Sequence, residues 1–484
     1  MTAAADSNPD PWAIARGAPV TGLRHVLDSA GWSAFAAALA GRADPWLLAM
    51  WADTAQVHAL LQNAEGVPLL VSGMVDAGWY AALSPHRPAA ALFERAVHDL
   101  WGHSAAGGTD SRPWLDHGDW PVLRPMSARP VPHAGVPEFP EFHEVPDAGD
   151  APDGLPLPQI ALGPVQAGDG APAHLRISVA GNTMVRLEAR LGYAHKGTLL
   201  LMRGKSPRAA ARLAARLDGE ATVAHSTAFA RAAEAACGAE IPPRAAALRD
   251  VAGALERVAM HLHDLGGLCA AAGARHPGLR FGWHREALLQ ASHAAFGHRL
   301  MMDCVVPGGV AADIAVDGPP AILAALDALT MEWPTLLRAT IGDSGLADRL
   351  AGLGALTAET VGSWASGRPG LARGSDVGSR LRAMLDAVAA GAGLLRAALP
   401  ALPPGAVGIG LPPGNGEGLG RSDTARGACW HWLRVDAGQV AACFAVDPGW
   451  MLWPLLEHAA QGAALADLEL IRRSLAPTVS GMDL

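Results

Sequence analysis

Residues 243–270 read PRAAALRDVAGALERVAMHLHDLGGLCA, and this stretch decides the fold class of the second half of the chain. Apolar residues recur in it every three to four positions, at Ala247, Val251, Leu255, Val258, Leu262 and Leu265. Charged residues occupy the other faces, so the pattern predicts one long amphipathic helix. Arg257 and His261 lie one turn apart and share a face, which is either solvated or, if buried, paired.

Other segments predict a mixture of helices and strands. Helices are expected at residues 45–61, 88–100, 285–303, 319–350 and 378–398, and strands at 67–75, 175–179, 184–191 and 430–444. Residues 403–420 are rich in Pro and Gly and predict a loop. Its alternate glycines, GNGEGLG at 414–420, indicate either a flexible surface loop or a row of N–H groups for an anion.

The composition excludes several classes of protein. The chain has 484 residues, of which 50% are apolar and 17% charged, so it can bury large cores and is not disordered as a whole. Its 37 Lys and Arg against 46 Asp and Glu give a net charge of −9. This acidic balance argues against nucleic acid as a partner.

Cysteines are few and scattered. The five cysteines show no local pair at the spacing used by zinc or iron–sulfur motifs. Their odd number also argues against a disulfide scaffold, so we expect a reducing, cytoplasmic location. Neither a secretory signal nor a membrane-spanning run is expected.

Residues 129–158 change in character, because Pro, Asp and Gly dominate and apolar periodicity disappears. We interpret this segment as a linker, although the EFH sequence at 141–143 predicts that part of it packs against the rest of the chain. The linker separates residues 1–128 from residues 159–484.

A series of motifs follows in order along the second part. They are GP at 163–164, GYAHKG at 192–197, AHS at 224–226, IPPRA at 241–245, ER at 256–257, GHRLM at 297–301, PGGV at 307–310, ARGSDV at 372–377, ARG at 425–427, DP at 447–448 and SGMDL at 480–484. The series resembles the superfamily that contains the 49-kDa subunit of respiratory complex I and the large subunit of nickel–iron hydrogenases.

The first part carries FERAVHDLWG at 93–102 and DSRPWL at 110–115, which resemble the 30-kDa subunit of complex I. A 30-kDa-like part fused ahead of a 49-kDa-like part is the layout of group 4, formate hydrogenlyase-type hydrogenases. The resemblance implies an α+β domain over residues 1–128 and a mainly α domain over residues 159–484. The latter would be a helical bundle with small antiparallel sheets.

The metal-ligand positions of that superfamily depart from its pattern here. Nickel–iron centres use two pairs of cysteine thiolates, soft donors that suit these metals. By the spacing to His225, the first pair would fall at Asp218 and Ala221. The second would lie near the C-terminus, where residues 472–484 contain no cysteine. We therefore expect no nickel–iron centre and no metal ligands in this chain.

The quinone-binding positions of the complex I relatives also differ. The resemblance implies a His and a Tyr for the quinone head group, and the corresponding residues are Gln166 and Gly219. Gln donates a hydrogen bond but delivers no proton at neutral pH, and the Gly side chain does neither. A quinone is thus a candidate ligand, but the His and Tyr that usually bind its head group are replaced here.

A set of charged and imidazole side chains is retained. The resemblance implies that these types line the cavity and its proton route, and they are our catalytic candidates: His195, His225, Arg244, Arg249, Glu256, Arg257, His261 and Asp376.

Two hypotheses follow from the resemblance. In the first, the chain is a subunit of a membrane-associated oxidoreductase related to NADH:quinone oxidoreductase and group 4 hydrogenase. It would lie on the cytoplasmic face of the inner membrane, beside antiporter-like membrane subunits and a small subunit that carries an iron–sulfur cluster. In the second, it is a degenerate paralogue that acts as a scaffold or assembly factor.

Overall fold

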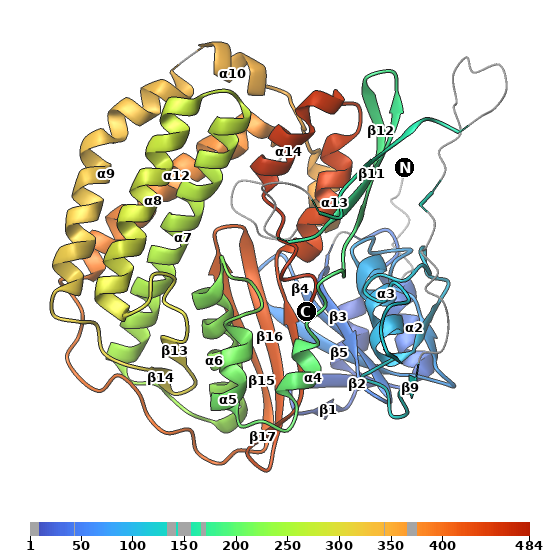
Figure 1. The fold of residues 1–484 in the computed structure, drawn as a ribbon. Coiled ribbons are helices and arrows are strands. Elements are labelled where there is room, and N and C mark those ends of the chain that lie inside the picture. The colour runs from blue at the N-terminus through green and yellow to red at the C-terminus, as the bar shows by residue number, and fades with distance from the viewer. Residues whose placement is uncertain are drawn as a thin grey trace, which may run out of the picture.

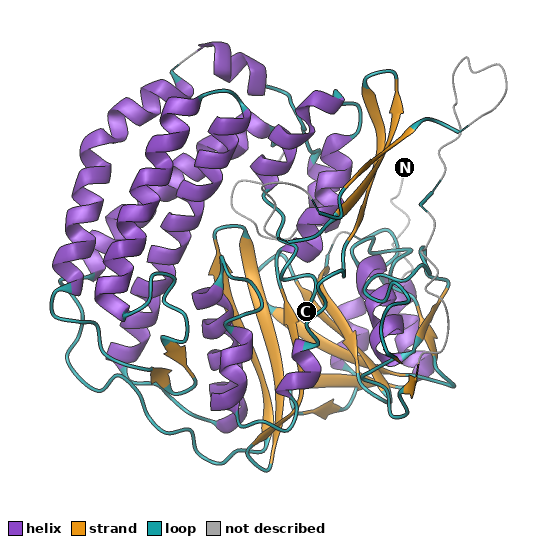
Figure 2. Ribbon diagram, viewed as in Figure 1, coloured by secondary structure: helices purple, strands orange, loops and turns teal. Residues whose placement is uncertain are grey.

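The computed structural model describes residues 9–42, 44–132, 142–143, 156–165, 171–342, 344–364 and 375–484. Helices and strands are mixed throughout, as predicted (Figures 1 and 2). Within these ranges, no helix combines the length and the apolar character that crossing a bilayer requires.

The N-terminal part is built on a five-stranded sheet of order β1-β2-β5-β4-β3, in which only β2 and β5 pair in parallel. Its elements are α1 (Pro11–Arg16), β1 (Val20–Thr21), β2 (Arg24–Leu27), α2 (Ser29–Ala38), β3 (Trp46–Ala52), β4 (Gln56–Gln62), β5 (Pro68–Met74), β6 (Trp79–Ala81), α3 (Ala90–Trp101), β7 (Ser104–Ala106), β8 (Val122–Leu123) and β9 (Val131–Pro132). The predicted strand at 67–75 and helix at 88–100 are confirmed, and Gly102 ends α3 in a left-handed conformation.

The helix predicted at residues 45–61 is wrong, because the segment forms the hairpin of β3 and β4. Apolar side chains point to both faces of this hairpin, and most of them are buried. A run that is apolar at nearly every position also has apolar residues at helical spacing, so the periodicity does not distinguish strand from helix here. The turn is fixed by Asp53, whose carboxylate accepts the N–H groups of Ala55 and Gln56 at 2.9 Å each.

The second part contains the long helices and three small antiparallel sheets. Its first elements are β10 (Gln159–Leu162), β11 (His174–Ala180), β12 (Thr183–Arg190), α4 (Thr198–Met202), α5 (Pro207–Ala214), α6 (Thr222–Cys237) and α7 (Pro243–Ala271). The next are α8 (Arg275–Phe296), β13 (Val305–Val306), β14 (Gly309–Val310), α9 (Gly318–Ile341), α10 (Ser344–Leu350), α11 (Ala358–Trp364) and α12 (Val377–Ala398). The last are β15 (Gly416–Thr424), β16 (Gly427–Asp436), β17 (Gln439–Val446), α13 (Gly449–Ala460), the 3₁₀ helix Leu465–Asp467 and α14 (Leu468–Leu475).

Helices α7, α8, α9 and α12 run side by side (Figure 1). The quoted stretch forms α7 over 29 residues, and the predictions at 319–350 and 378–398 correspond to α9 with α10 and to α12. The helix predicted at 285–303 is shifted, because α8 starts at Arg275 and ends at Phe296, where the left-handed Gly297 (φ +77°) follows and stops the helix. The β11–β12 hairpin is confirmed.

The alternate glycines at 414–420 are neither a flexible loop nor an anion site, because β15 begins at Gly416 and the glycine face of this segment lies against α6. A Cβ on Gly418 would stand 1.8 Å from the carbonyl oxygen of Ala232, and one on Gly420 would stand 2.0 Å from that of Ala228. Only glycine allows this approach of helix and strand backbones.

The sheet of β15–β17 joins the two parts of the molecule. Trp51 of β3 stacks on Phe444 of β17 with ring centroids 5.2 Å apart, and Phe93 of α3 stacks on Trp450 of α13 at 4.5 Å. Arg24 of β2 pairs with Glu417 of β15 at 2.7 Å, and both side chains are buried. The boundaries 1–128, 129–158 and 159–484 stay a prediction, but one hydrophobic core includes residues from both parts.

The 133–141 and 144–155 segments of the predicted linker lie outside the described residues. The two described residues between them pack as the sequence predicted. The Phe142 ring stacks on His174 at 5.3 Å, and His143 Nδ1 lies 2.7 Å from Glu188 Oε1.

We predict that Gly418→Ala lowers the free energy of unfolding by about 3 kcal/mol, since the backbone of α6 must move to admit a methyl group. Gly393→Ala in α12 is the matched control: no atom lies within 4 Å of its added Cβ, so it should be neutral or stabilise by up to about 1 kcal/mol. Denaturant unfolding measures both, and an unchanged midpoint for Gly418→Ala would contradict the close packing of α6 on β15.

Candidate functional site

The N-terminus of α6 is capped by a carboxylate from another helix. Glu256 of α7 accepts the backbone N–H groups of Val223 at 2.6 Å and of Ala224 at 2.9 Å. The first N–H groups of a helix have no partner within the helix, so this contact both satisfies them and favours a negative charge. Burial nevertheless raises the pKa of Glu256 to about 8. Glu256 therefore holds a proton near neutral pH.

His225, in the first turn of α6, is the centre of a buried chain of three side chains. Its Nε2 lies 3.1 Å from Asp447 Oδ2, and its Nδ1 lies 3.1 Å from His431 Nε2. Asp447 Oδ1 accepts from the Gly449 N–H and the Thr478 hydroxyl at 2.7 Å each. Each member is at most 2% exposed.

Burial and the neighbouring His225 together set the charges of the Asp447 and His431 side chains. Burial raises the pKa of Asp447, but the hydrogen bond and charge of His225 outweigh it and bring the pKa below its usual value. Burial lowers the pKa of His431 far below its usual value, and the charge of His225 lowers it further. Asp447 is thus an anion and His431 is neutral. The side chains of Asp447, His225 and His431 form a continuous hydrogen-bonded path along which a proton can exchange.

Arg426 is buried at the centre of a second charged cluster. Its guanidinium pairs with Asp264 at 2.7 Å and with Glu220 at 2.7 Å, and Glu220 also lies 3.3 Å from His263 Nε2. Two carboxylates against one guanidinium leave an excess of negative charge, which the hydrogen bonds offset only in part.

Asp218 lies next to this cluster and is 3% exposed. One carboxylate oxygen accepts the Glu220 N–H at 3.0 Å, and the other is buried with no hydrogen-bond partner within the part of the chain described. Burial and the charge of Asp447 raise the pKa of Asp218. The pKa of about 6 is closer to neutral pH than that of an exposed aspartate, so this carboxyl group can both take up and donate a proton.

Asp218 and the cluster around Arg426 line a cavity of about 330 Å³. Asp218, Gly219, Glu220 and Arg426 line one side, and the C-terminal segment Thr478, Val479 and Ser480 lines another. Position 218, where the resemblance implies a cysteine, and position 219, where it implies a tyrosine, therefore both open into the same cavity. We refer to it as the Asp218 cavity.

The residues present do not fit a nickel–iron centre. Over the described ranges, no three His, Cys, Asp or Glu side chains are grouped so that they could hold a metal ion. Cys429 contacts the Ser422 carbonyl, Cys443 contacts Met202, and Cys237 lies under Gly414, so these thiols are used in packing. We derive no metal chemistry for this cavity.

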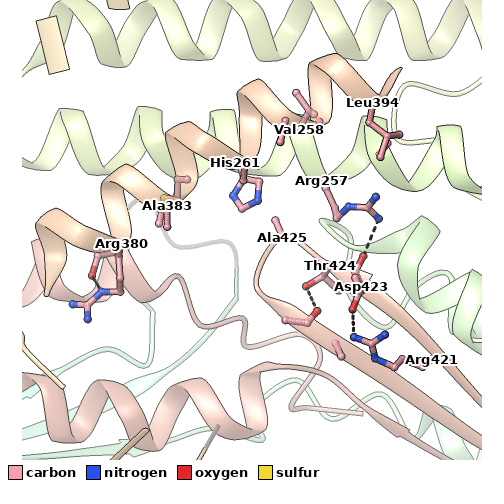
Figure 3. A pocket seen from close by; sticks show the side chains of 18 residues that line it. Arg257, Val258, His261, Arg380, Ala383, Leu394, Arg421, Asp423, Thr424 and Ala425 are labelled. Carbon is pink, nitrogen blue, oxygen red and sulfur yellow. Dashed lines mark hydrogen bonds and ion pairs between the residues drawn. The ribbon is translucent and has the colours of Figure 1, made fainter. Parts of the chain in front are cut away.

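A second cavity, of about 440 Å³, lies between α7, α12 and the turn that joins β15 to β16 (Figure 3). Arg257 and His261 both line it, as expected for residues that share a face of α7. Arg257 donates to the Asp423 carbonyl oxygen at 3.3 Å.

The other predicted site residues make contacts elsewhere. His195 Nδ1 lies 2.7 Å from the Asp483 carbonyl oxygen, and Arg244 pairs with Asp313 at 2.8 Å. Arg249 pairs with the buried Glu234 at 2.5 Å. Asp376 caps the N-terminus of α12 through the N–H of Ser379 at 2.7 Å. A proton-transfer role for these four stays a prediction, and Gln166 lies outside the described residues.

The sequence alone did not identify the partners of His225 and Glu256. Among the predicted residues, the structure brings these two together at α6 and brings Arg257 and His261 together at the second cavity. Five contributors were missed as site residues: His431, Asp447, Asp264, Glu220 and Arg426. The DP motif at 447–448 and the ARG motif at 425–427 were the only local signals, and neither says which residue is the partner.

Most of the chain is similar in sequence to known proteins of the kind that its motifs resemble. A model of the family described as the respiratory-chain NADH dehydrogenase 49 Kd subunit matches residues 273–385, which include α8 and α9. Formate hydrogenlyase subunit 5 of Escherichia coli (strain K12) is 26% identical over 446 residues, covering 84% of this chain and 77% of that protein. A carbon monoxide-induced hydrogenase of Rhodospirillum rubrum is 26% identical over 356 residues, covering 66% of this chain and 98% of that protein.

A solved structure, that of the membrane-bound sulfane sulfur reductase, an archaeal respiratory membrane complex, contains a chain of similar fold. The TM-score is 0.64 at 18% identity, and the match covers 68% of this chain and 98% of that chain. At this identity the likeness shows a shared fold.

We predict that Glu256→Gln flattens the pH dependence of stability. The raised pKa means that the stabilising contribution of the protonated Glu256 is complete below the ordinary value of 4.5 and is lost as the pH rises through about 8. Between about pH 6 and pH 9, the wild type should therefore lose roughly 2 kcal/mol more than the variant.

Urea unfolding at both pH values measures this difference. Glu286→Gln, at an exposed glutamate of α8, is the control and should keep the wild-type pH dependence. Equal losses in wild type and Glu256→Gln would show that Glu256 does not titrate in this range.

Proposed function

We propose that this chain, a relative of the 49-kDa subunit of respiratory-chain NADH dehydrogenase and of hydrogenase large subunits, is the proton-donating subunit of a multisubunit, membrane-associated oxidoreductase. Electrons would reach an acceptor in the Asp218 cavity, with no nickel–iron centre. The observation that supports this proposal is that a buried carboxyl group, Asp218, stands where the resemblance expects a metal-binding cysteine and lines the cavity.

The chemistry suits an acceptor that takes up electrons and protons together, such as a quinone. Reduction of a quinone to a quinol consumes two electrons and two protons. Asp218 lies at the cavity, and its raised pKa brings proton uptake closer to neutral pH, so it would take up a proton and donate it as the first proton to a reduced oxygen. Gly219 leaves space there but supplies no donor.

The buried groups behind the cavity would replace that proton. The charge of Asp218 raises the pKa of Glu256, so the two carboxyl groups are close enough to influence each other. Glu256 caps the helix turn that carries His225, from which the hydrogen-bonded path continues to Asp447 and His431. These groups would shift protons without large movements of the backbone.

The partners follow from the names of the relatives. Formate hydrogenlyase subunit 5 and a chain of a membrane-bound reductase belong to multisubunit systems by name. We propose that a small subunit with an iron–sulfur cluster delivers the electrons, because this sequence has no paired cysteines for a cluster. Membrane subunits would hold the complex to the cytoplasmic face of the inner membrane.

The second candidate function is a scaffold or assembly factor without turnover. Ala221 and Gly219 favour it, because neither side chain can replace the ligand that the resemblance implies at its position. The tight pairing of Arg426 with Asp264 and Glu220 also favours it, since this cluster holds the helices together with no substrate present.

The test is made on the intact complex, isolated through a tag on this chain. We predict less than stoichiometric nickel, and reduction of a soluble quinone by a chemical or NADH donor. Asp218→Asn keeps the shape of the side chain but removes its proton, so turnover should fall by about a hundredfold while the complex stays assembled. Asp250→Asn, at an exposed position of α7, is the control with wild-type turnover.

Two results would contradict the proposal. Stoichiometric nickel would show that the metal has ligands that we have not recognised. Absence of electron transfer with every donor and quinone, in a complex that fails to assemble when this chain is deleted, would establish the scaffold function instead.

A further inference from the structure

The cavity between α7 and α12 has an extended apolar wall. Small and aliphatic side chains from the two helices form it: Ala254, Val258, Ala383, Met384, Ala387, Ala390, Gly391 and Leu394. Its volume of about 440 Å³ lies in the range of small-molecule sites. None of the 18 lining residues is Phe, Tyr or Trp, and the imidazole of His261 is the one ring among them. The wall suits an aliphatic chain.

Positively charged side chains from α7, α12 and β15 also line the cavity. Three of the 18 lining residues are arginines, Arg257, Arg380 and Arg421, and Asp423 is the one acidic residue among them. Figure 3 shows Arg257 and Arg421 converging on Asp423 from the two sides, with His261 between Ala383 and Ala425. The lining therefore has an excess of positive charge, which favours an anion.

These arginines have different partners, and Arg380 is close enough to Asp376 for its charge to lower the pKa of that carboxyl group. Arg421 donates to the Asp423 carboxylate at 2.6 Å, whereas the bond from Arg257 goes to the uncharged Asp423 carbonyl oxygen. Arg380 donates to Ser474 Oγ at 2.9 Å and to the carbonyl oxygen atoms of Ser375 and Gly354 at 2.8 and 3.0 Å. A guanidinium at the cavity surface can bind a carboxylate or phosphate through two parallel hydrogen bonds.

We propose that this cavity binds an amphipathic anion, with its carboxylate or phosphate head at Arg257 and its aliphatic chain along α7 and α12. The site shares no lining residue with the Asp218 cavity. The proposal therefore does not rest on the function proposed above, and either can fail alone. A fatty acid and a single-chain lipid phosphate share the required chemistry.

The test is calorimetric titration of the full-length chain with dodecanoate and dodecyl phosphate, below the concentrations at which they form micelles. We expect one molecule to bind per chain, and the tighter of the two identifies the head group. Dodecyltrimethylammonium tests the charge, and inorganic phosphate tests the aliphatic chain. Both should bind at least about tenfold more weakly, since each lacks one half of the recognition.

Two variants separate the halves of the site. Arg257→Gln should weaken the binding of the better anion about tenfold by removing a charged hydrogen bond. Ala387→Phe fills the apolar part of the cavity and keeps every charge. It should weaken the binding of the same anion at least about tenfold. Arg396→Gln is the matched control for Arg257→Gln. Arg396 lies on α12, outside the cavity lining, and pairs with Asp327.

Three results would overturn the proposal: binding of the cationic amphiphile as tight as that of the anions, binding of inorganic phosphate as tight as that of dodecyl phosphate, or an equal loss in Arg257→Gln and Arg396→Gln. Circular dichroism of each variant checks that it is folded. If Arg257→Gln is unfolded, Ala387→Phe and the choice among the amphiphiles still decide.

Discussion

The contact between α6 and the glycine face of β15 is the constraint on which the site depends. Helix and strand meet backbone to backbone, since added Cβ atoms at Gly418 and Gly420 would fall within about 2 Å of α6 carbonyl oxygens. This approach brings His225 within hydrogen-bonding distance of His431 on the neighbouring strand β16. The carboxyl group of Glu256 fixes the N-terminal end of α6, because it satisfies the N–H groups there.

The alternation of side chains in β15 and β16 connects this site to the N-terminal sheet. Gly418 and His431 face α6, whereas their neighbours Glu417 and Trp432 face the other way, toward Arg24 and Trp51. One hairpin therefore forms part of the site on one face and part of the shared core on the other. This explains why one hydrophobic core extends across the predicted linker.

Buried carboxyl groups and one guanidinium characterise the described lining of the Asp218 cavity. A thiolate is a soft ligand for nickel and iron, and an aspartate is a hard one that binds a proton when it is buried. Asp218 has such a setting beside Asp447, while Arg426 neutralises part of the charge of Asp264 and Glu220. This chain shares a fold with a chain of the solved reductase, and the proposed function rests on the side chain at position 218.

The sequence by itself determined the elements that depend on local periodicity: α7, α12, the β11–β12 hairpin and the shared face of Arg257 and His261. It also determined that cysteines are missing from the expected positions, since spacing is a one-dimensional property. Residues 45–61 and the glycines at 414–420 were mispredicted, because the same local pattern suits a strand once its neighbours are known. Only the tertiary structure decided the pairs Arg426–Asp264 and His225–Asp447, whose members are 162 and 222 residues apart in the chain. The raised pKa of Glu256 was also decided there, because burial exists only when distant segments pack together.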